Sequence, residues 1–443
     1  MIEVEEARRL VLEPIEPLGA ESVPLGAAFR RVLAAPVISR EAAPPFDRAE
    51  MDGYAVRSGE VAGASEAKPV VLEVAIEITA GSLPGAQLRP GTAARIMTGA
   101  PVPAGADAVI PREWTREAPR QVSILRPSGG PGSFVGPRGE DFAEGEVLLA
   151  AGTRLHAAAL ALAAAAGVDP VWCRRRPRVA ILSTGDELVP AGAPLRPGAI
   201  HETNRLLLSA LVEAAGGVPV DCGLARDEER DLEEKLGEAL RADAVITTGG
   251  VSVGDRDLVR ATLARLGVES RFWRVAVRPG KPLAYGLFRG RPVFGLPGNP
   301  ASVLVTFHLF AGPAILRLQG CERVEPPAFE AILEEPVAGP PDRRGYFRGR
   351  LRADGNALRV RLAGSQSSAC LRSLAGANAL VVVPAGARLD AGARVRVEPL
   401  DWPDPEARPA GPAGEAAQLG PGARGAPGGA EERPAEGRRC CSP

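Results

Sequence analysis

The sequence is poor in the residues that most often carry metal-assisted or covalent catalysis. Its 443 residues include only three histidines, and its six cysteines show no metal-ligand spacing with a histidine in support. We therefore expect no zinc site, and the absence of a G-x-S-x-G elbow or a Cys/His pair disfavours a covalent nucleophile. Aromatic residues make up only 4% of the chain, so its cores must consist mainly of Ala, Val and Leu.

An excess of either charge is also missing. The 53 basic and 54 acidic residues leave a formal net charge of -1, which disfavours nucleic acid as a partner over the whole surface. No run reaches the about 20 apolar residues that a membrane span requires, and the acidic N-terminus does not have the pattern of a secretory leader. We expect a cytoplasmic protein, in a reducing compartment, with no membrane partner.

The length predicts about two to four domains. Residues 1–40 hold two helical patterns, VEEARRLVLEPI and LGAAFRRVLAAPV, and residues 70–149 hold short β-type runs. The alanine-rich stretch from His156 to Pro170 predicts a buried helix. Strands and helices alternate over residues 177–320, which predicts a doubly wound, largely parallel sheet. Residues 326–400 predict a small barrel or sandwich, and the Pro/Gly/Ala-rich tail after residue 402 is expected to be disordered.

Four glycine-containing turns lie in the α/β segment, each after a short apolar run. They are STGDE at 183–187, TTGGVSVGDRD at 247–257, RPGKP at 278–282 and LPGNPAS at 296–302. Ligands of open α/β sheets bind beyond the carboxyl ends of the strands. We therefore expect the turns to form one composite pocket for a phosphate or another oxyanion.

Individual residues of these turns suit such a ligand. Gly249 and Gly250 permit close backbone approach, and Ser252 adds a hydroxyl before the next helix, whose free amides favour an anion. The spacing matches neither a Walker A loop nor a dinucleotide fingerprint. Lys281 supplies a point charge on a turn limited by two prolines. Helix capping alone would explain Ser302.

Acidic residues recur in loops of the same sequence. Carboxylates beside an anion pocket are useful when a hard cation bridges them to phosphate, because Mg²⁺ takes oxygen ligands from both. Each acid taken alone is explained as well by a helix cap or a solvated charge. These acids are Asp52, Asp141, Asp186, Glu187, Glu202, Asp227 and Asp257.

Several longer motifs resemble one enzyme family. PPFDRAEMDGYAVRS, RIMTGAPVPAGADAVIPRE, GEDF, ILSTGDEL, ETNRLLLSALVEAAG, ITTGGVSVGDRDLV, FWRVAVRPGKP and FGLPGNPAS occur in this order. They are similar to the molybdopterin molybdenumtransferases, that is, the MoeA proteins and the E domain of gephyrin. The resemblance covers about residues 1 to 400 and leaves out the tail.

The resemblance implies a fold and a reaction. It implies a linking domain of residues 1–44 and 151–176, a β-rich insertion domain of 45–150, a MogA-like doubly wound α/β domain of 177–325, a C-terminal β-barrel of 326–401 and a tail of 402–443. Molybdate and adenylylated molybdopterin would give molybdenum cofactor and AMP, with Mg²⁺ assisting. A homodimer is implied, whose site lies between the insertion domain of one subunit and the α/β domain of the other, and the molybdopterin adenylyltransferase is a possible partner.

The resemblance also assigns residues. The catalytic set is Asp52, Asp141, Glu202, Asp227, Asp257 and Lys281; the substrate-binding set is Thr98, Gly249, Gly250, Ser252, Pro297, Pro300, Ser302, Arg348 and Ser368; the metal ligands are Asp227 and Asp257. Ser367 stands where the family usually has glycine, so a less close backbone approach is expected beside Ser368.

Two alternatives stay open on the sequence. A molybdopterin adenylyltransferase shares the TTGG-type α/β domain, although its members usually lack the insertion domain that this chain has. A scaffold without catalysis is the other alternative, because the E domain of gephyrin also clusters receptors.

Overall fold

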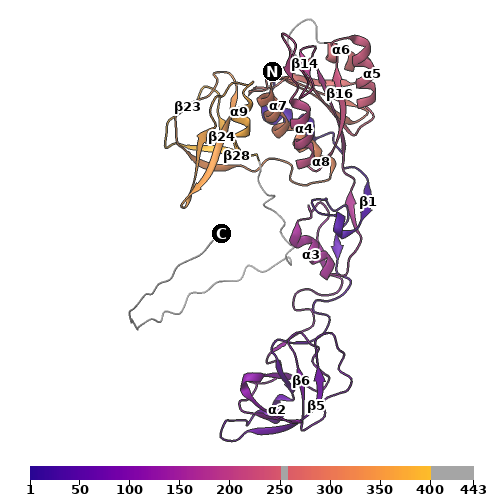
Figure 1. Cartoon of the computed structure of the whole chain (residues 1–443), viewed down its shortest axis with the longest axis vertical. Helices are drawn as coiled ribbons and strands as arrows, with labels where there is room; N and C mark the ends of the chain where they lie inside the picture. Colours follow the sequence, from indigo (N-terminus) through magenta and orange to yellow (C-terminus); the bar gives the residue numbers. More distant parts are fainter. Residues whose placement is uncertain (251–257, 401–443) are drawn as a thin grey trace.

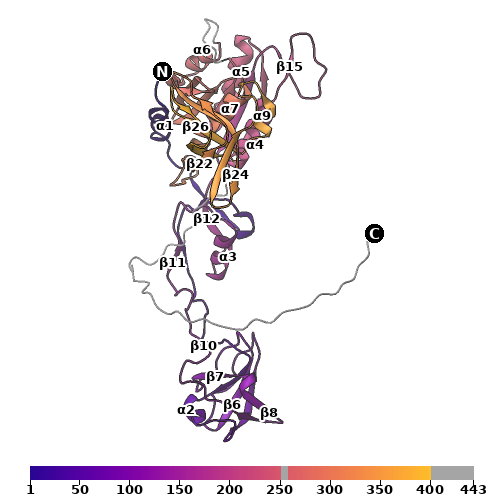
Figure 2. The same ribbon diagram turned by 90° about the vertical axis from the view of Figure 1, so that its left-hand side faces the viewer.

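The computed structural model describes residues 1–250 and 258–400, so Ser252, Asp257 and the tail expected to be disordered lie outside the described residues. The described chain is elongated (Figure 1). An α/β unit and a small barrel lie side by side at one end, a narrow middle unit follows, and a β-rich insertion unit forms the other end (Figure 2).

The α/β unit is built on a six-stranded sheet. Its strand order is β16 (Val218–Ala225), β13 (Arg178–Thr184), β17 (Ala244–Thr248), β21 (Arg291–Leu296), β20 (Pro282–Phe288) and β18 (Glu269–Arg274). The first four strands are parallel to one another, whereas β20 and β18 are antiparallel to their neighbours. The largely parallel sheet expected from the alternating pattern is confirmed.

Helices cover both faces of this sheet, so the sheet is doubly wound. Along β13, Val179 packs with α4 (Asn204–Ala214), whereas Ala180 faces the opposite core with α5 (Glu229–Ala239) and α6 (Leu258–Arg265). This division follows from the strand period of two, which sends successive side chains to opposite faces.

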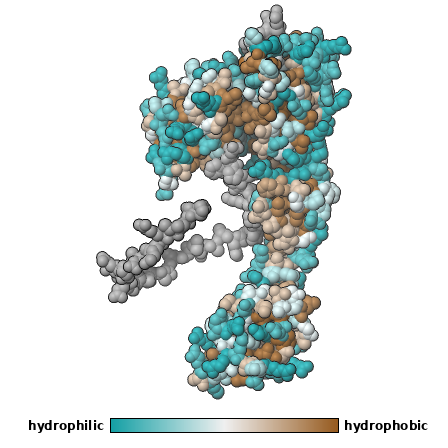
Figure 3. All heavy atoms as spheres, in the orientation of Figure 1, coloured by the Kyte–Doolittle hydropathy of each residue, from teal (hydrophilic) through white to brown (hydrophobic). Residues whose placement is uncertain are grey.

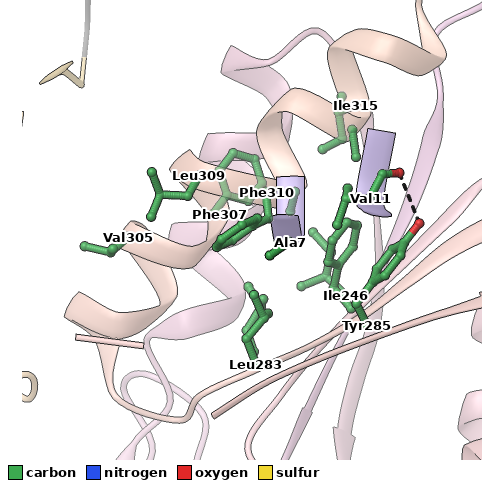
Figure 4. Packing of buried hydrophobic residues seen from close by; sticks show 14 of the residues in the cluster. Ala7, Val11, Ile246, Leu283, Tyr285, Val305, Phe307, Leu309, Phe310 and Ile315 are labelled. Atoms are coloured by element: carbon green, nitrogen blue, oxygen red, sulfur yellow. Dashed lines mark hydrogen bonds between the residues drawn. The ribbon is translucent and has the colours of Figure 1, made fainter. Parts of the chain in front are cut away.

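The N-terminal helix α1 (Val4–Leu12) packs in the core of the α/β unit. Ala7 and Val11 lie beside Phe310 and Ile315, and the hydroxyl of Tyr285 donates a hydrogen bond to the carbonyl of Val11 at 3.2 Å (Figure 4). The periodicity of α1 predicts a helix but does not reveal which unit receives it. The domain limits given above remain predictions.

The last helical segment of the α/β unit contains a wider turn. It runs as α7 (Pro300–Thr306), the π-helix η3 (Phe307–Ala311) and α8 (Gly312–Leu318). Pro313 has no N–H, so it cannot donate the usual helical hydrogen bond to the carbonyl of Leu309. The guanidinium Nε of Arg8 donates to that carbonyl instead, at 3.3 Å. The helix from Pro300 to Leu318 is long and apolar enough to cross a membrane, but it is 83% buried inside the protein, as in a core helix.

The middle unit is made by two separate stretches of chain. The strand β1 (Ala20–Val23) pairs with β12 (Val171–Arg174), and β2 (Val37–Ile38) pairs with β11 (Val147–Leu149). The helix expected for LGAAFRRVLAAPV is wrong, because this segment forms only the 3-10 turn η1 (Leu25–Ala27) and then bridges the extended chain around residues 154 and 173. Tertiary pairing overrides its helical pattern.

The alanine-rich helix α3 (Ala157–Ala165) forms as expected, but it is not buried as a whole. Only Ala159 and Ala163 within it are fully covered by the chain. Alanine stabilises a helix without large contacts, so its abundance predicts the helix better than its burial.

The insertion unit contains a six-stranded sheet. Its strand order is β7 (Ala108–Pro111), β4 (Gly53–Val56), β6 (Thr92–Ile96), β5 (Val70–Ile78), β9 (Gln121–Ile124) and β8 (Thr115–Ala118). The short pair β3 (Arg48–Ala49) and β10 (Val135–Gly136) lies beside it. The short helix α2 (Ser58–Val61) follows β4, and the 3-10 turn η2 (Arg112–Trp114) follows β7.

The C-terminal unit is a closed barrel of five strands. The order is β24 (Arg344–Asp354), β25 (Ala357–Leu362), β22 (Phe329–Leu333), β28 (Arg394–Pro399) and β26 (Ala379–Val383), and β26 pairs back to β24. The short strand β19 (Val277–Arg278) of the α/β unit adds to β24 in parallel. Main-chain hydrogen bonds therefore join the barrel to the RPGKP turn.

Candidate active site

The strand order brings all four glycine-containing turns to one edge of the α/β sheet. STGDE, TTGG and LPGNP follow β13, β17 and β21, which are parallel neighbours. RPGKP precedes β20, whose antiparallel pairing with β21 places its first residues beside the end of that strand. The common edge expected from the sequence is therefore observed for the described parts of the turns.

A pocket of about 450 Å³ lies between two of these turns and the barrel. RPGKP and LPGNPAS form its α/β side, and the ends of β24 and the 363–370 loop form its barrel side. Its lining residues include the cations Arg278, Lys281, Arg343 and Arg348, and no described carboxylate lines it. The pocket thus has the charge expected of an anion site.

The RPGKP turn presents Lys281 because Gly280 permits close packing behind it. Gly280 is buried at a φ of +115°, and a Cβ there would lie 2.6 Å from Cγ2 of Thr306 on α7. Only glycine fits both the backbone conformation and the space. Lys281 itself is partly exposed and lines the pocket.

The LPGNPAS turn is bound directly to the barrel. Nδ2 of Asn299 donates to Oγ of Ser368 at 3.0 Å, and the amide of Ala301 donates to the carbonyl of Ser368 at 3.0 Å. Asn299 occupies the N-cap position of α7 but makes no side-chain capping bond. Ser302 is buried and lines the pocket with Pro297, and Pro300 begins α7.

Arg348 is a buried cation without a carboxylate partner in the described chain. It is 1% exposed, and it donates from Nη2 to the carbonyls of Ser365 and Ser367 and from Nε to Oγ of Ser373. Burial lowers the pKa of its guanidinium, and the electrostatic effect of nearby Cys370 opposes that shift. Because neutral groups hold it in place, its positive charge is left for a ligand.

A second polar group lies where LPGNP meets the TTGG turn. Nδ2 of Asn204 donates to Oγ1 of Thr248 at 3.0 Å and to the carbonyl of Gly298 at 2.7 Å. A Cβ on Gly249 would lie 2.2 Å from the carbonyl oxygen of Thr184. Among the described residues, nothing hydrogen-bonds to two buried atoms of this group, Oγ1 of Thr184 and Oδ1 of Asn204, so they are candidates to meet a ligand. Gly250, the last described residue of the turn, is exposed.

The carboxylate of Glu202 is buried and already fully engaged. It accepts hydrogen bonds from the hydroxyl of Ser183 at 3.0 Å and from the amide of Arg205 at 2.8 Å, and it pairs with the Arg205 guanidinium at 3.3 Å. This geometry supports α4 and the STGDE turn. It suits a positioning role better than proton transfer.

Asp227 lies in an acidic surrounding after β16. Burial raises the pKa of its carboxyl, and the charges of Asp186 and Glu187 add to that shift. A divalent cation would relieve the repulsion, and carboxylate oxygens are ligands that suit Mg²⁺. The described residues contain no group of three side chains in metal-ligand geometry, and Asp257 lies outside them. The donor chemistry fits Mg²⁺, with Asp227 as the described candidate.

The insertion unit carries the remaining predicted residues far from this pocket. Asp52 accepts hydrogen bonds from the amide and the hydroxyl of Thr98 at 2.7 and 2.8 Å, and these bonds lower the pKa of its carboxyl. Asp141 is exposed, and its amide donates to Ala43. Within one chain, the middle unit lies between the insertion unit and the α/β unit (Figure 1, Figure 2).

The fold and the pocket define a multidomain α/β protein with a cationic pocket between its sheet and a small barrel. Family models agree along the chain: the MoeA N-terminal region (domain I and II) matches residues 2–167, a probable molybdopterin binding domain matches 180–317, and the MoeA C-terminal region (domain IV) matches 330–400. The chain therefore belongs to the MoeA family, whose curated members are molybdopterin molybdenumtransferases.

Individual relatives cover most of the chain. A protein of Nostoc sp. named molybdopterin molybdenumtransferase is 44% identical over 372 residues, which are 83% of this chain and 85% of the relative. Molybdopterin molybdenumtransferase 2 of Mycobacterium tuberculosis is 38% identical over 87% of this chain and 96% of the relative. The crystal structure of the molybdopterin biosynthesis MoeA protein from Pyrococcus horikosii is 35% identical, with a TM-score of 0.79 over 91% of this chain and all of that one.

Sequence reasoning missed several polar residues at the site. Asn204 and Thr184 carry buried atoms without a partner in the described part of the chain. Gln366 lines the pocket and hydrogen-bonds to the backbone of Arg348. The sequence gives little indication of their role, because each is an uncharged polar residue next to a glycine, a charged residue or a serine of the same motif. Asn299 stands at the N-cap position of α7, but its side chain binds the barrel instead of capping the helix.

Proposed function

We propose that this chain is a molybdopterin molybdenumtransferase that inserts molybdate into adenylylated molybdopterin and releases AMP. The observation that carries the proposal is the pocket whose described lining holds four cationic side chains, among them Lys281 and Arg348, and no carboxylate. Such a pocket favours a small oxyanion over a neutral ligand or a cation.

The pocket residues would act by position and charge. Lys281 supplies a compact charge, Arg348 supplies a buried one fixed by neutral acceptors, and the hydroxyls of Ser302 and Ser368 offer hydrogen bonds to oxyanion oxygens. These groups would hold molybdate while the two dithiolene sulfurs bind its metal and one of its oxygens leaves as water with the two thiol protons. No protein nucleophile is needed for this role.

The opposite end of the same sheet edge suits the phosphate-bridging cation. Mg²⁺ bound there would supply charge stabilisation for cleavage of the phosphoanhydride. Asp227, with Asp186 and Glu187 nearby, would hold it together with Asp257, which lies outside the described residues. The cations before β20 and in the barrel, and the acids after β16 and β13, would thus divide this region between two kinds of ligand.

A second subunit would bring Asp52, Thr98 and Asp141 to the pocket. This proposal is supported by the middle unit, which keeps the insertion unit apart from the α/β unit within one chain (Figure 1, Figure 2). It is also supported by apolar residues that the middle unit leaves uncovered, such as Phe29 at 55% and Trp172 at 56% exposure. On the face shown in Figure 3, hydrophobic residues, coloured brown, gather over the middle unit. Exposed apolar patches of this kind are typical of subunit interfaces.

A cytoplasmic location is proposed with the same function. It is supported by the four described cysteines, which are all free thiols and fit a reducing compartment.

The test is AMP release by the purified full chain with Mg²⁺ and adenylylated molybdopterin, with and without molybdate. Release that requires molybdate supports the proposal. An adenylyltransferase would instead consume ATP and molybdopterin, and a scaffold would release no AMP under either condition. Either result would overturn the assignment.

A further inference from the structure

A hydrogen-bonded histidine–glutamate pair joins the α/β unit to the barrel away from the pocket. Nε2 of His308 lies 3.2 Å from Oε2 of Glu398, and their side chains are only 12% and 2% exposed. Burial alone would raise the pKa of Glu398, but the hydrogen bond and charge of His308, with Arg8 and Arg396, keep it below the usual range. Glu398 is therefore held as an anion inside an interface between two units.

The π-helix turn places His308 on this interface. The turn follows α7, which carries Ser302 at the pocket, and its freed carbonyl at Leu309 is satisfied by buried Arg8. A continuous helical segment thus connects the pocket to His308. If His308 moves relative to the barrel, Ser302 and the α/β side of the pocket should move with it.

The register of the barrel connects Glu398 to the other side of the pocket. Glu398 on β28 pairs with Leu380 on β26, and Leu380 pairs with Arg348 on β24. Directly opposed residues point to the same face of a sheet, and Leu380 packs in the core of the α/β unit rather than inside the barrel. Arg348 and Glu398 therefore lie in one row on the docked face, roughly 10 Å apart at the usual strand spacing.

We infer that the His308–Glu398 pair is a positioning device that sets the location of Arg348 relative to Lys281 and Ser302. The pair fixes the Glu398 end of the row at the π-helix turn. The Arg348 end of the row supplies the buried cation of the pocket. This inference rests on the proposed function for its kinetic consequence. Its structural consequence, a less firmly held 363–370 loop, does not depend on that function.

The experiment compares His308→Gln and Glu398→Gln with His156→Gln in the full chain. Both test variants keep side-chain volume and a hydrogen-bonding group, and circular dichroism checks their fold. His156 is an exposed histidine of the middle unit and serves as the matched control. Amide hydrogen exchange is measured over residues 344–370, and the KM for molybdate and kcat are measured separately.

The inference predicts faster exchange over residues 363–368 in both test variants and not in the control. It also predicts a KM for molybdate raised about 3- to 10-fold, with a smaller change in the KM for adenylylated molybdopterin. Unchanged exchange, or a lower melting temperature with unchanged exchange in this loop, would overturn it. If the wild-type protein releases no AMP, the proposed function fails, and the exchange data still decide the inference.

Discussion

Asn299 of the α/β unit donates a hydrogen bond to Ser368 of the barrel at 3.0 Å, directly beside the cationic pocket. The amide of Ala301 binds the carbonyl of Ser368, so one serine is held by both the side chain and the backbone at the start of α7. The two walls of the pocket are therefore joined at its rim. The pocket depends on barrel docking as much as on the α/β turns.

Replacing Ser368 with alanine tests this contact. The backbone bond to Ala301 remains, while the hydroxyl that Asn299 binds is lost. A neutral hydrogen bond contributes about 0.5–1.5 kcal/mol net, so the KM for molybdate should rise about 2- to 10-fold with little change in fold. Steady-state kinetics at varied molybdate check this. Ser365→Ala is the matched control in the same loop, because its hydroxyl is not part of the bond to Asn299.

Gly280→Ala should damage the pocket through backbone and packing together. The new Cβ would meet Thr306 at 2.6 Å, and the φ of +115° is unfavourable for alanine. We expect a loss of about 1–3 kcal/mol of unfolding free energy, measured by urea denaturation. Adding Thr306→Ser removes the methyl group that clashes and should recover part of the loss. No recovery would mean that the backbone conformation alone sets the cost.

Asp227→Asn should raise the melting temperature slightly when Mg²⁺ is absent. A carboxyl whose pKa is raised in the folded state binds its proton more tightly there, so its contribution to stability is lost as pH rises through the folded pKa. At neutral pH the charged group is therefore unfavourable beside Asp186 and Glu187. Differential scanning calorimetry should also show that added Mg²⁺ stabilises the wild type more than the variant. Equal stabilisation of both would remove Asp227 from the metal site.

Acid should weaken the contact at Asp243. Its carboxylate accepts two hydrogen bonds from Arg175, at 2.8 and 2.9 Å, and one from the amide of Arg178. Although burial would raise its pKa, these bonds keep the pKa of the Asp243 carboxyl below its ordinary value. The contribution of Asp243 to the free energy of unfolding is fully present above the pKa that the carboxyl has in the unfolded chain. It is lost as the pH falls through the lower pKa of the folded state, hence below about pH 4. Asp243→Asn should lose unfolding free energy at pH 7, and the difference from wild type should shrink toward pH 3.

Much of this fold could be predicted from sequence periodicity. The strands of the α/β unit and the barrel follow apolar runs and alternation, and the glycine turns mark the ligand edge. Contacts between distant segments could not be predicted in this way. The packing of α1 on the α/β core, the π-helix turn around His308 and the bond from Asn299 to Ser368 depend on which surfaces meet.

The site was predictable to a similar extent. Lys281, Pro297, Ser302, Arg348 and Ser368 meet at one pocket, as the family resemblance implies they should lie near one ligand. The resemblance could not reveal that Glu202 is already saturated by Ser183 and Arg205. Asn204 and Thr184 were missed because an unpartnered atom is a property of packing, not of residue type.

The most direct measurement is the molybdate-dependent rate of AMP release by Lys281→Ala beside wild type and Lys68→Ala. Lys68 is an exposed lysine of the insertion unit and controls for loss of a positive charge. We predict that Lys281→Ala, still folded, loses at least about 10-fold in kcat/KM for molybdate, while Lys68→Ala matches the wild type. A normal rate in Lys281→Ala would contradict the assignment of this pocket as the molybdate site.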